Sequence, residues 1–163
     1  MKGFEPSLLE KLFDEAPRSP GRGNVLQAVS VEQYKESVAN DLEGLLNSRA
    51  AFGTDALSGF PNCCQSLLTY GLVDFSSMSL ANAYDRAAIC RSIEQAISRH
   101  ETRLHDVHVT LDANPCLGAG LHFTINALLD LQPAKEAVSF DALLQPSTLQ
   151  YSVSRMRRQA AVV

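Results

Sequence analysis

Three carboxylates, Glu43, Glu101 and Asp112, are candidates by residue type for the acid pair of a glycoside hydrolase. Such an enzyme needs two acids that face each other across a cleft, roughly 5 to 10 Å apart. Glu43 is expected on the polar side of an amphipathic helix, where a carboxylate is normally solvated, and no pattern brings a second acid opposite it. The sequence therefore does not favour a hydrolase, and we predict no catalytic residue.

The four histidines could hold a metal, or act with a cysteine nucleophile, only if the fold brought the ligands together. His108 and His122 are both expected on the polar face of one hairpin, where they could be neighbours across the strands. The alternative is that they are ordinary solvated residues of that face. His100 and His105 lie at a helix end and near a strand, which does not obviously bring them to one point. No metal site and no cofactor are predicted.

The four cysteines show neither a CxxC motif nor the spacing of Cys/His metal ligands. The adjacent pair, Cys63 and Cys64, cannot readily form a disulfide with each other. Four cysteines without a bridging pattern suit a reducing cytosol. Buried or idle thiols are therefore favoured over a metal site or redox chemistry for Cys63, Cys64, Cys90 and Cys116.

Composition and charge narrow the class of protein further. With 163 residues and 45% hydrophobic content, the chain fits one globular domain that folds without disulfides or metals. A net charge of -4 gives no general attraction to nucleic acid or to an anionic membrane. No run approaches the roughly 18 apolar residues of a membrane span, and Met1–Pro6 does not resemble a signal peptide. We expect a cytoplasmic protein that binds no nucleic acid and does not insert into a membrane.

Residues 1–24 are expected to form a short amphipathic helix on a flexible tether. Ser7 and Glu10 make a capping box at the start of Ser7–Glu15. Two prolines and two glycines in residues 17–24 end the helix. A helix this short is marginal alone, so it needs a surface, either the chain's own core or a neighbouring protein. Its apolar stripe consists of Leu8, Leu9, Leu12 and Phe13.

Residues 25–154 are expected to form the main domain, which begins with helices. A second capping box, Ser30 with Gln33, starts a helix that runs through Arg49. The loop-rich residues 50–79 are expected to hold one short helix around Gln65–Tyr70, and a further helix covers Asp85–Arg99. The predicted inward residues are Val31, Tyr34, Val38, Leu42, Leu45 and Leu46 in the first helix and Ile89, Ile93, Ala96 and Ile97 in the last, with Arg86, Arg91 and Arg99 outward.

After the last helix the hydrophobic period changes from 3.6 to 2, which is typical of strands with one buried face. Turns are expected at Asn114–Gly120, Gln132–Lys135 and Gln145–Ser147, and a basic tail occupies residues 155–163. Helices followed by strands indicate an α+β fold, with N-terminal helices packed on one face of a C-terminal, mainly antiparallel sheet of three to four strands. The alternating apolar residues of the expected strands are Val107, Val109 and Leu111; Leu121, Phe123, Ile125, Ala127, Leu129 and Leu131, which share one face; Val138 and Phe140; and, in a possible fourth strand, Leu149, Tyr151 and Val153.

Three short stretches carry a resemblance to a known family: Asp41–Arg49 (DLEGLLNSR), Ser66–Ser76 (SLLTYGLVDFS) and Glu101–Leu104 (ETRL). They are similar, in order and spacing, to the DLE-LLNTR, S-L-YGLPDFS and EPRL patterns of the baseplate wedge family. That family comprises TssE of bacterial type VI secretion systems and its homologues in contractile phage tails. Residues 121–129 also follow the family's L-F-I-ALL strand pattern. The departures are Ser48, Val73 and Thr102, the last of which replaces the proline of the EPRL junction.

The resemblance covers about residues 25–153 and implies a structural, non-catalytic role. It implies a subunit of a cytoplasmic baseplate, assembled at the inner membrane with TssF-like and TssG-like wedge proteins. TssB/TssC-like sheath subunits would begin to polymerise on it. The alternative function is a stand-alone adaptor that binds regulatory proteins through the same fold, and a glycoside hydrolase is the distant third.

The predicted partner-binding residues lie in two places. Glu101 and Arg103, with Leu104, are expected where the last helix meets the sheet, and we hypothesise that the two charges fix a contact to a wedge or sheath partner. The alternative is an intramolecular pair that pins this corner. Open edges of the C-terminal strands could also accept a strand from another chain. In the N-terminal helix the predicted contacts are Leu8, Leu12 and Phe13.

Overall fold

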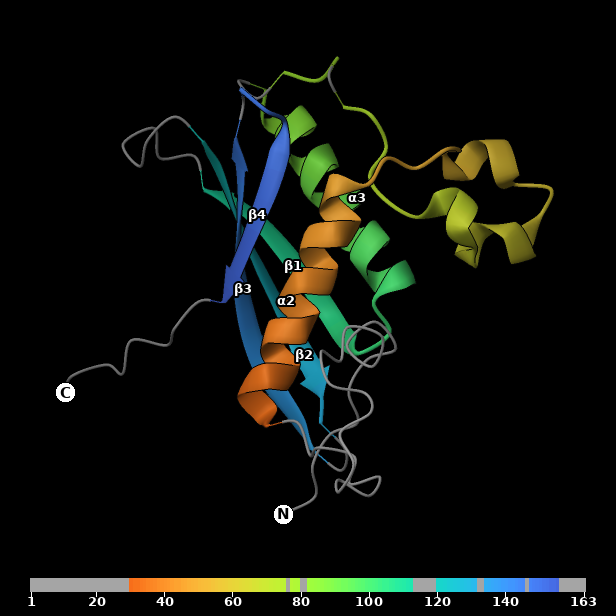
Figure 1. Cartoon of the computed structure of the whole chain (residues 1–163). Coiled ribbons are helices and arrows are strands. Elements are labelled where there is room, and N and C mark those ends of the chain that lie inside the picture. The colour runs from red at the N-terminus through yellow and green to blue at the C-terminus, as the bar shows by residue number, and fades with distance from the viewer. Residues whose placement is uncertain are drawn as a thin grey trace, which may run out of the picture. The chain divides into compact units, whose positions relative to one another are not determined.

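The computed structural model describes residues 30–75, 77–79, 82–112, 120–131, 134–145 and 147–155. In these ranges two α-helices precede an antiparallel sheet with strand order β1-β2-β3-β4 (Figure 1), which confirms the predicted α+β class. Three short 3-10 helices lie between the α-helices. The elements are α2 Val31–Asn47, η1 Thr54–Leu57, η2 Pro61–Gln65, η3 Leu67–Thr69, α3 Ala83–His100, β1 Leu104–Asp112, β2 Leu121–Asp130, β3 Lys135–Gln145 and β4 Gln150–Arg155.

The chain divides into two compact units, Met1–Val38 and Ala39–Val163, with the boundary inside α2. The described part of the first unit begins with the predicted capping box. The Gln33 backbone N–H donates to Ser30 Oγ at 3.2 Å, and the Ser30 N–H donates to Gln33 Oε1 at 3.0 Å. The predicted N-terminal helix with its tether in residues 1–24 lies outside the described residues. So does the tail beyond Arg155.

In the second unit, α3 follows its predicted amphipathic pattern. Its buried residues are Ile89, Ile93, Ala96 and Ile97, the four expected from the 3.6-residue period. The helix begins before the predicted Asp85 because Asn82 caps it: the Tyr84 N–H donates to Asn82 Oδ1 at 3.0 Å. Among the helices of the described ranges, none combines the length and hydropathy that a bilayer-spanning segment needs.

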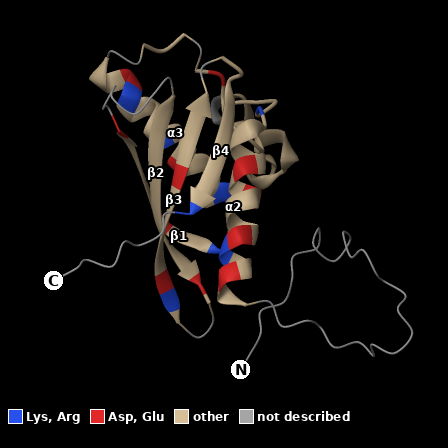
Figure 2. Cartoon of the chain, turned by 60° about the vertical axis from the view of Figure 1, so that its left-hand side comes forward, with Lys and Arg blue, Asp and Glu red and all other residues tan. Residues whose placement is uncertain are grey.

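One face of the sheet forms the core of the second unit. Across the β2–β3 ladder, Ile125 pairs with Phe140 and Phe123 with Ala142, and all four are at most 1% exposed. Figures 1 and 2 show α3 and residues 39–47 of α2 on the same side of the sheet. Alternation along the strands therefore buries one face against the helices and leaves polar residues such as Asn126 on the other.

The strand boundaries differ from the prediction at two points. Strand β1 begins at Leu104, ahead of the predicted Val107, and a bulge between His105 and His108 takes up the extra residue, with Asp106 at φ 50°. Leu149 was expected in the last strand, and this was wrong. It precedes β4 in a left-handed turn at φ 55° and is 59% exposed.

The loop between the helices also differs from the prediction. One short helix was expected around Gln65–Tyr70, but residues 54–69 form three 3-10 helices. Gly53, Gly59 and Pro61 interrupt this stretch, so each segment is too short to build α-helical turns and closes i→i+3 bonds instead. The Ser66 side chain accepts from the Leu68 N–H at 3.3 Å and starts the last of them.

The Tyr151 hydroxyl gives a pH prediction. Tyr151 is 4% exposed, and among the described residues its hydroxyl has no hydrogen-bond partner. Burial raises the pKa of Tyr151 to about 12, with Arg49 opposing and Cys90 adding to the shift. Because the folded-state pKa lies above the unfolded value of 10, the neutral phenol stabilises the fold fully below pH 10. That contribution is lost as the pH rises toward 12.

We therefore expect Tyr151→Phe to change the pH dependence of unfolding by urea. At pH 7 the variant should equal the parent or exceed it by up to about 1 kcal/mol, because an unsatisfied buried hydroxyl is removed. At pH 12 the parent should have lost about 2 kcal/mol relative to the variant. Equal slopes of stability against pH between pH 10 and 12 would contradict the assignment.

Candidate functional site

A salt-bridged corner joins α3 to β1. Glu101 directly follows the last residue of α3 and caps the helix, since its N–H donates to the Ile97 carbonyl at 2.8 Å. The Glu101 carboxylate turns back and accepts from the Arg103 backbone N–H at 3.1 Å and from Arg103 Nε at 2.7 Å. Arg103 Nη2 also contacts Glu101 Oε2. The Asp130 N–H donates to the Arg103 carbonyl at 3.0 Å, which ties the corner to the end of β2.

The same guanidinium reaches helix α2. Arg103 Nη2 lies 2.5 Å from Asp41 Oδ2, so one arginine bridges two carboxylates. Burial opposes the charge on Arg103, but the hydrogen bonds and charges of Glu101 and then of Asp41 outweigh it. The pKa of Arg103 therefore lies above its usual range. The Glu101 side chain is 9% exposed and that of Arg103 is 22% exposed, so the pair is largely shielded from solvent.

The loop after η3 packs against this corner. His100 Nε2 lies 2.9 Å from the Thr69 carbonyl oxygen, so Nε2–H can donate to it. The Tyr70 ring meets the His100 ring edge to face, with centroids 5.4 Å apart. Burial, and then the negative charges of Asp41 and Glu101, raise the pKa of Tyr70. We call Asp41, Tyr70, His100, Glu101 and Arg103 the corner cluster.

A short parallel bridge fastens the same loop to the end of α2. The Leu72 N–H donates to the Ser48 carbonyl at 2.9 Å, and the Ala50 N–H donates to the Leu72 carbonyl at 3.1 Å. Gly71 makes this approach possible because it adopts φ 108° and lies against the Ser48 backbone. The stretches Asp41–Arg49, Ser66–Ser76 and Glu101–Leu104 therefore meet at one place in the fold.

Side chains of α2 cover part of the edge of the sheet at β4. Asn47 and Glu43, one helical turn apart, bind the strand backbone: Asn47 Oδ1 accepts from the Tyr151 N–H and Glu43 Oε2 from the Val153 N–H, both at 2.8 Å. Asn47 Nδ2 donates to the Tyr151 carbonyl at 2.8 Å. Glu43 is thus not merely solvated, as the polar helix face suggested. A strand that added to β4 here would have to displace these side chains.

The opposite edge of the sheet is covered in the same way. Glu94 of α3 accepts from the Val109 N–H of β1 at 2.8 Å and lies 3.2 Å from His108 Nδ1. One turn earlier on α3, the Cys90 thiol has a hydrogen bond with the backbone of Leu111. Burial, and then the negative charge of Glu94, raise the pKa of this thiol. Polar side chains of α2 and α3 therefore occupy backbone groups at both edge strands, where the sequence suggested open edges.

The residues considered for catalysis or metal binding lie apart. Glu43 binds β4, Glu101 binds Arg103, and Asp112 pairs in register with His122 at the end of β1. His108 pairs with Asn126, so the prediction that His108 and His122 could be cross-strand neighbours was wrong. Within the described ranges, no three His, Cys, Asp or Glu side chains gather as they would around a metal ion.

The predicted partner-binding residues of the corner are positioned by intramolecular contacts. Glu101 is 7% exposed and Leu104 3%, and the intramolecular pair of Glu101 with Arg103 is present. Thr102, between them, is exposed. The partner contact stays a prediction, while Leu8, Leu12 and Phe13 lie outside the described residues. Sequence reasoning missed Asp41, Tyr70 and His100 as members of the cluster, although the first two belong to stretches that carried the resemblance.

Comparison with known proteins gives one family. The model of the family described as baseplate wedge protein gp25 matches residues 32–134, more than half of the chain. This range contains all five residues of the corner cluster. No curated protein matches the chain.

Proposed function

Because the chain belongs to the family of the baseplate wedge protein gp25, which has a structural role in the baseplate of contractile tail systems, we propose that it is the wedge subunit of a type VI secretion baseplate. It binds TssF-like and TssG-like wedge proteins at the cytoplasmic side of the inner membrane. It also offers the first TssB/TssC-like sheath subunits a surface on which to polymerise. Its action is binding, without a chemical step.

The corner cluster is the observation that supports this role best. Arg103 and its two carboxylates join two separate stretches of the chain, and the contacts of Thr69 and Tyr70 with His100 attach the third. A preorganised surface loses little conformational entropy when a partner binds, which suits a subunit of a permanent assembly. Thr102 is the exposed residue at the tip of this corner and is the position where a partner would make contact.

Co-purification tests the proposal. The full chain is expressed with the TssF-like and TssG-like proteins of the same genome and analysed by size-exclusion chromatography with light scattering. We expect one discrete complex that contains all three proteins. A monomer that binds neither partner, when each partner is shown to be folded, would contradict the wedge function. Deleting residues 7–15 in the same assay tests the predicted contact of the N-terminal segment.

A pair of surface variants tests the place of contact. Thr102→Arg adds a bulky charge at the corner without removing Glu101 or Arg103, so the melting temperature should stay unchanged while the complex weakens by about tenfold or more. Ser152→Arg makes the same change at an exposed position of β4, the strand at the other edge of the sheet, and should leave the complex intact. Equal complex formation by both variants would place the contact elsewhere.

A further inference from the structure

The loop between α2 and α3 contains a segment that packs mainly on itself. This segment, residues 53–68, here called the hook, holds η1, η2 and most of η3, and Figure 1 shows these short helices beside α3, away from the sheet. Each of them packs mainly against its neighbour in the hook. Among the side chains described in residues 53–68, Leu57 is the only buried one, whereas Phe60 is 64% and Leu67 86% exposed. Little apolar burial therefore holds the hook closed.

Backbone and hydroxyl hydrogen bonds close the hook. The Phe52 N–H donates to the Leu68 carbonyl at 3.2 Å across its base. Inside the hook the bonds join residues three apart, as from the Cys63 N–H to the Phe60 carbonyl at 2.9 Å, and 3-10 bonds of this kind have poorer geometry than α-helical ones. The Ser66 hydroxyl donates to the Cys63 carbonyl at 2.7 Å. Because water competes for such bonds in the open segment, each one stabilises the closed hook only modestly.

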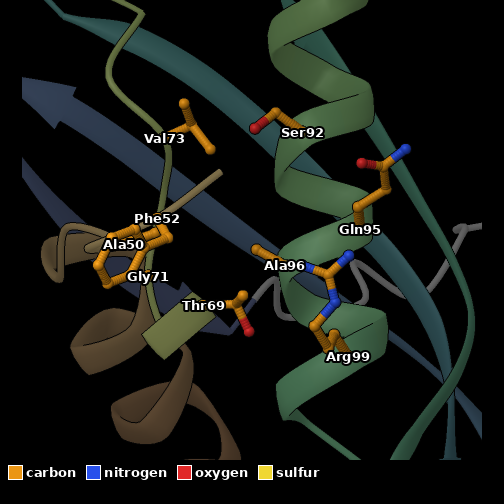
Figure 3. Close-up of a pocket in the computed structure, with 9 residues that line it drawn as sticks. All are labelled: Ala50, Phe52, Thr69, Gly71, Val73, Ser92, Gln95, Ala96 and Arg99. Carbon is orange, nitrogen blue, oxygen red and sulfur yellow. The ribbon is translucent and has the colours of Figure 1, made fainter. Parts of the chain in front are cut away.

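The chain that follows the hook is fastened to the rest of the fold. Thr69 is 2% exposed, and its carbonyl oxygen lies 2.9 Å from His100 Nε2. Leu72 forms the backbone bridge to Ser48. Figure 3 shows Phe52 and Thr69 on one side of a small hollow and α3 on the other. The hollow has a volume of about 40 Å³, enough to admit water to the base of the hook. The corner cluster and the bridge both lie outside the hook.

We propose that the hook opens as one unit while its base, α3 and the sheet stay folded. Segments with little buried apolar surface and solvent-exposed hydrogen bonds open at a lower free energy than the core of a protein does. On opening, the bonds from Thr69 Oγ1 to the Cys64 and Ser66 carbonyls, at 2.8 and 3.1 Å, break together with the bonds inside the hook. The loop then changes shape without loosening the contacts of Arg103 or Gly71, whichever partner the chain binds.

Native-state hydrogen exchange of the full chain, measured by NMR, tests the proposal. The N–H groups of Ala56, Phe60 and Cys63 report on the hook, since each donates inside it, and that of Ala142 in β3 reports on the core. After division by the intrinsic rates, the three hook amides should share one opening constant, at least about a hundredfold larger than that of Ala142. Urea below the unfolding midpoint should change the hook constant little, because opening exposes little surface. A hook constant equal to that of Ala142 would overturn the proposal.

A core variant separates local opening from global unfolding. Ile125, fully buried in the central strand β2, is replaced by valine, which destabilises the core without touching the hook. The exchange of Ala142 should accelerate by about fivefold, whereas the three hook amides should keep the exchange rates of the parent, because the hook opens with the core intact. Equal acceleration of Ala142 and the hook amides would mean that the hook opens only when the whole chain unfolds, and the proposal would fail.

A hook variant tests whether the segment opens as one unit. Ser66→Ala removes the hydroxyl bond to the Cys63 carbonyl. The exchange of Ala56, Phe60 and Cys63 should then accelerate by one common factor of about fivefold. Ser98→Ala makes the same change at an exposed position of α3 and should leave the three amides as they are in the parent. Acceleration confined to the amides next to Ser66 would show separate local openings and contradict a single unit.

Discussion

Replacing Arg103 by alanine is expected to lower the free energy of unfolding by about 3 kcal/mol, measured by urea denaturation at pH 7. The substitution leaves the Glu101 carboxylate, 9% exposed, without its cation, and an unpaired buried charge costs far more than a broken surface salt bridge. Asp41 loses the same partner but is 36% exposed, so water can replace the arginine there. Most of the loss should therefore come from Glu101.

A double-mutant cycle separates the pair from the rest of the corner. Glu101→Gln with Arg103→Met removes both charges, so the double variant should be clearly more stable than the sum of the two single changes predicts. Arg91→Ala serves as a control, because Arg91 is exposed and should change stability by less than about 0.5 kcal/mol. Additive losses in the cycle would show that Arg103 does not stabilise the fold through Glu101.

The outcome also decides between the two hypotheses for these charges. If Arg103→Ala unfolds the corner and weakens the wedge complex in proportion to lost stability, the pair acts by holding the corner rigid. If a variant such as Thr102→Arg abolishes the complex at unchanged melting temperature, the corner surface itself contacts the partner. Glu101 makes three contacts with Arg103, so the intramolecular pair is present under either hypothesis.

The elements that depend on periodic burial could be predicted from the sequence. In α3 the four buried residues are the four expected, and in β2 Phe123, Ile125, Ala127 and Leu129 all face the core. A helix or strand with one buried face repeats its apolar residues at 3.6 or 2, whatever it packs against. Leu149 continues the alternation of Tyr151 and Val153 in sequence, but it lies in the turn directly before β4, at φ 55°, and so does not share the face of the strand.

The contacts of the corner cluster, and those between α2 and β4, leave no such periodic signal in the sequence. Arg103 and Asp41 are 62 residues apart, and Tyr151 and Asn47 are 104 apart. The sequence pattern predicts a solvated position for a polar helix residue, whether that residue faces water or the backbone of a strand. Glu43 was therefore expected on an exposed face. Only the resemblance of three short stretches to one family indicated that they belong together, and it could not show that one arginine joins two of them.

Replacing Gly71 by alanine is expected to destabilise the chain by at least about 2 kcal/mol, the second large effect. At φ 108° an L-residue is strained, and a Cβ built on Gly71 would lie 2.5 Å from the Ser48 carbonyl oxygen. Both atoms belong to the backbone or are fixed to it, so no side-chain rotation relieves the clash. The bridge between Leu72 and Ser48 should open, and with it the contact of the loop with α2.

Gly59→Ala, in the same loop of residues 50–75 between α2 and α3, is the matched control for Gly71→Ala. A Cβ at Gly59 meets nothing within 4 Å and its φ is not in the left-handed region, so alanine there should be neutral or stabilising by up to about 1 kcal/mol. Amide hydrogen exchange of Leu72, whose N–H donates to Ser48, locates the effect. Exchange should accelerate in Gly71→Ala and not in Gly59→Ala, because only the first forces the two backbones apart. Equal stability of the two variants would mean that the loop is not fastened to α2 at Gly71, and that its contacts with His100 hold it at the corner.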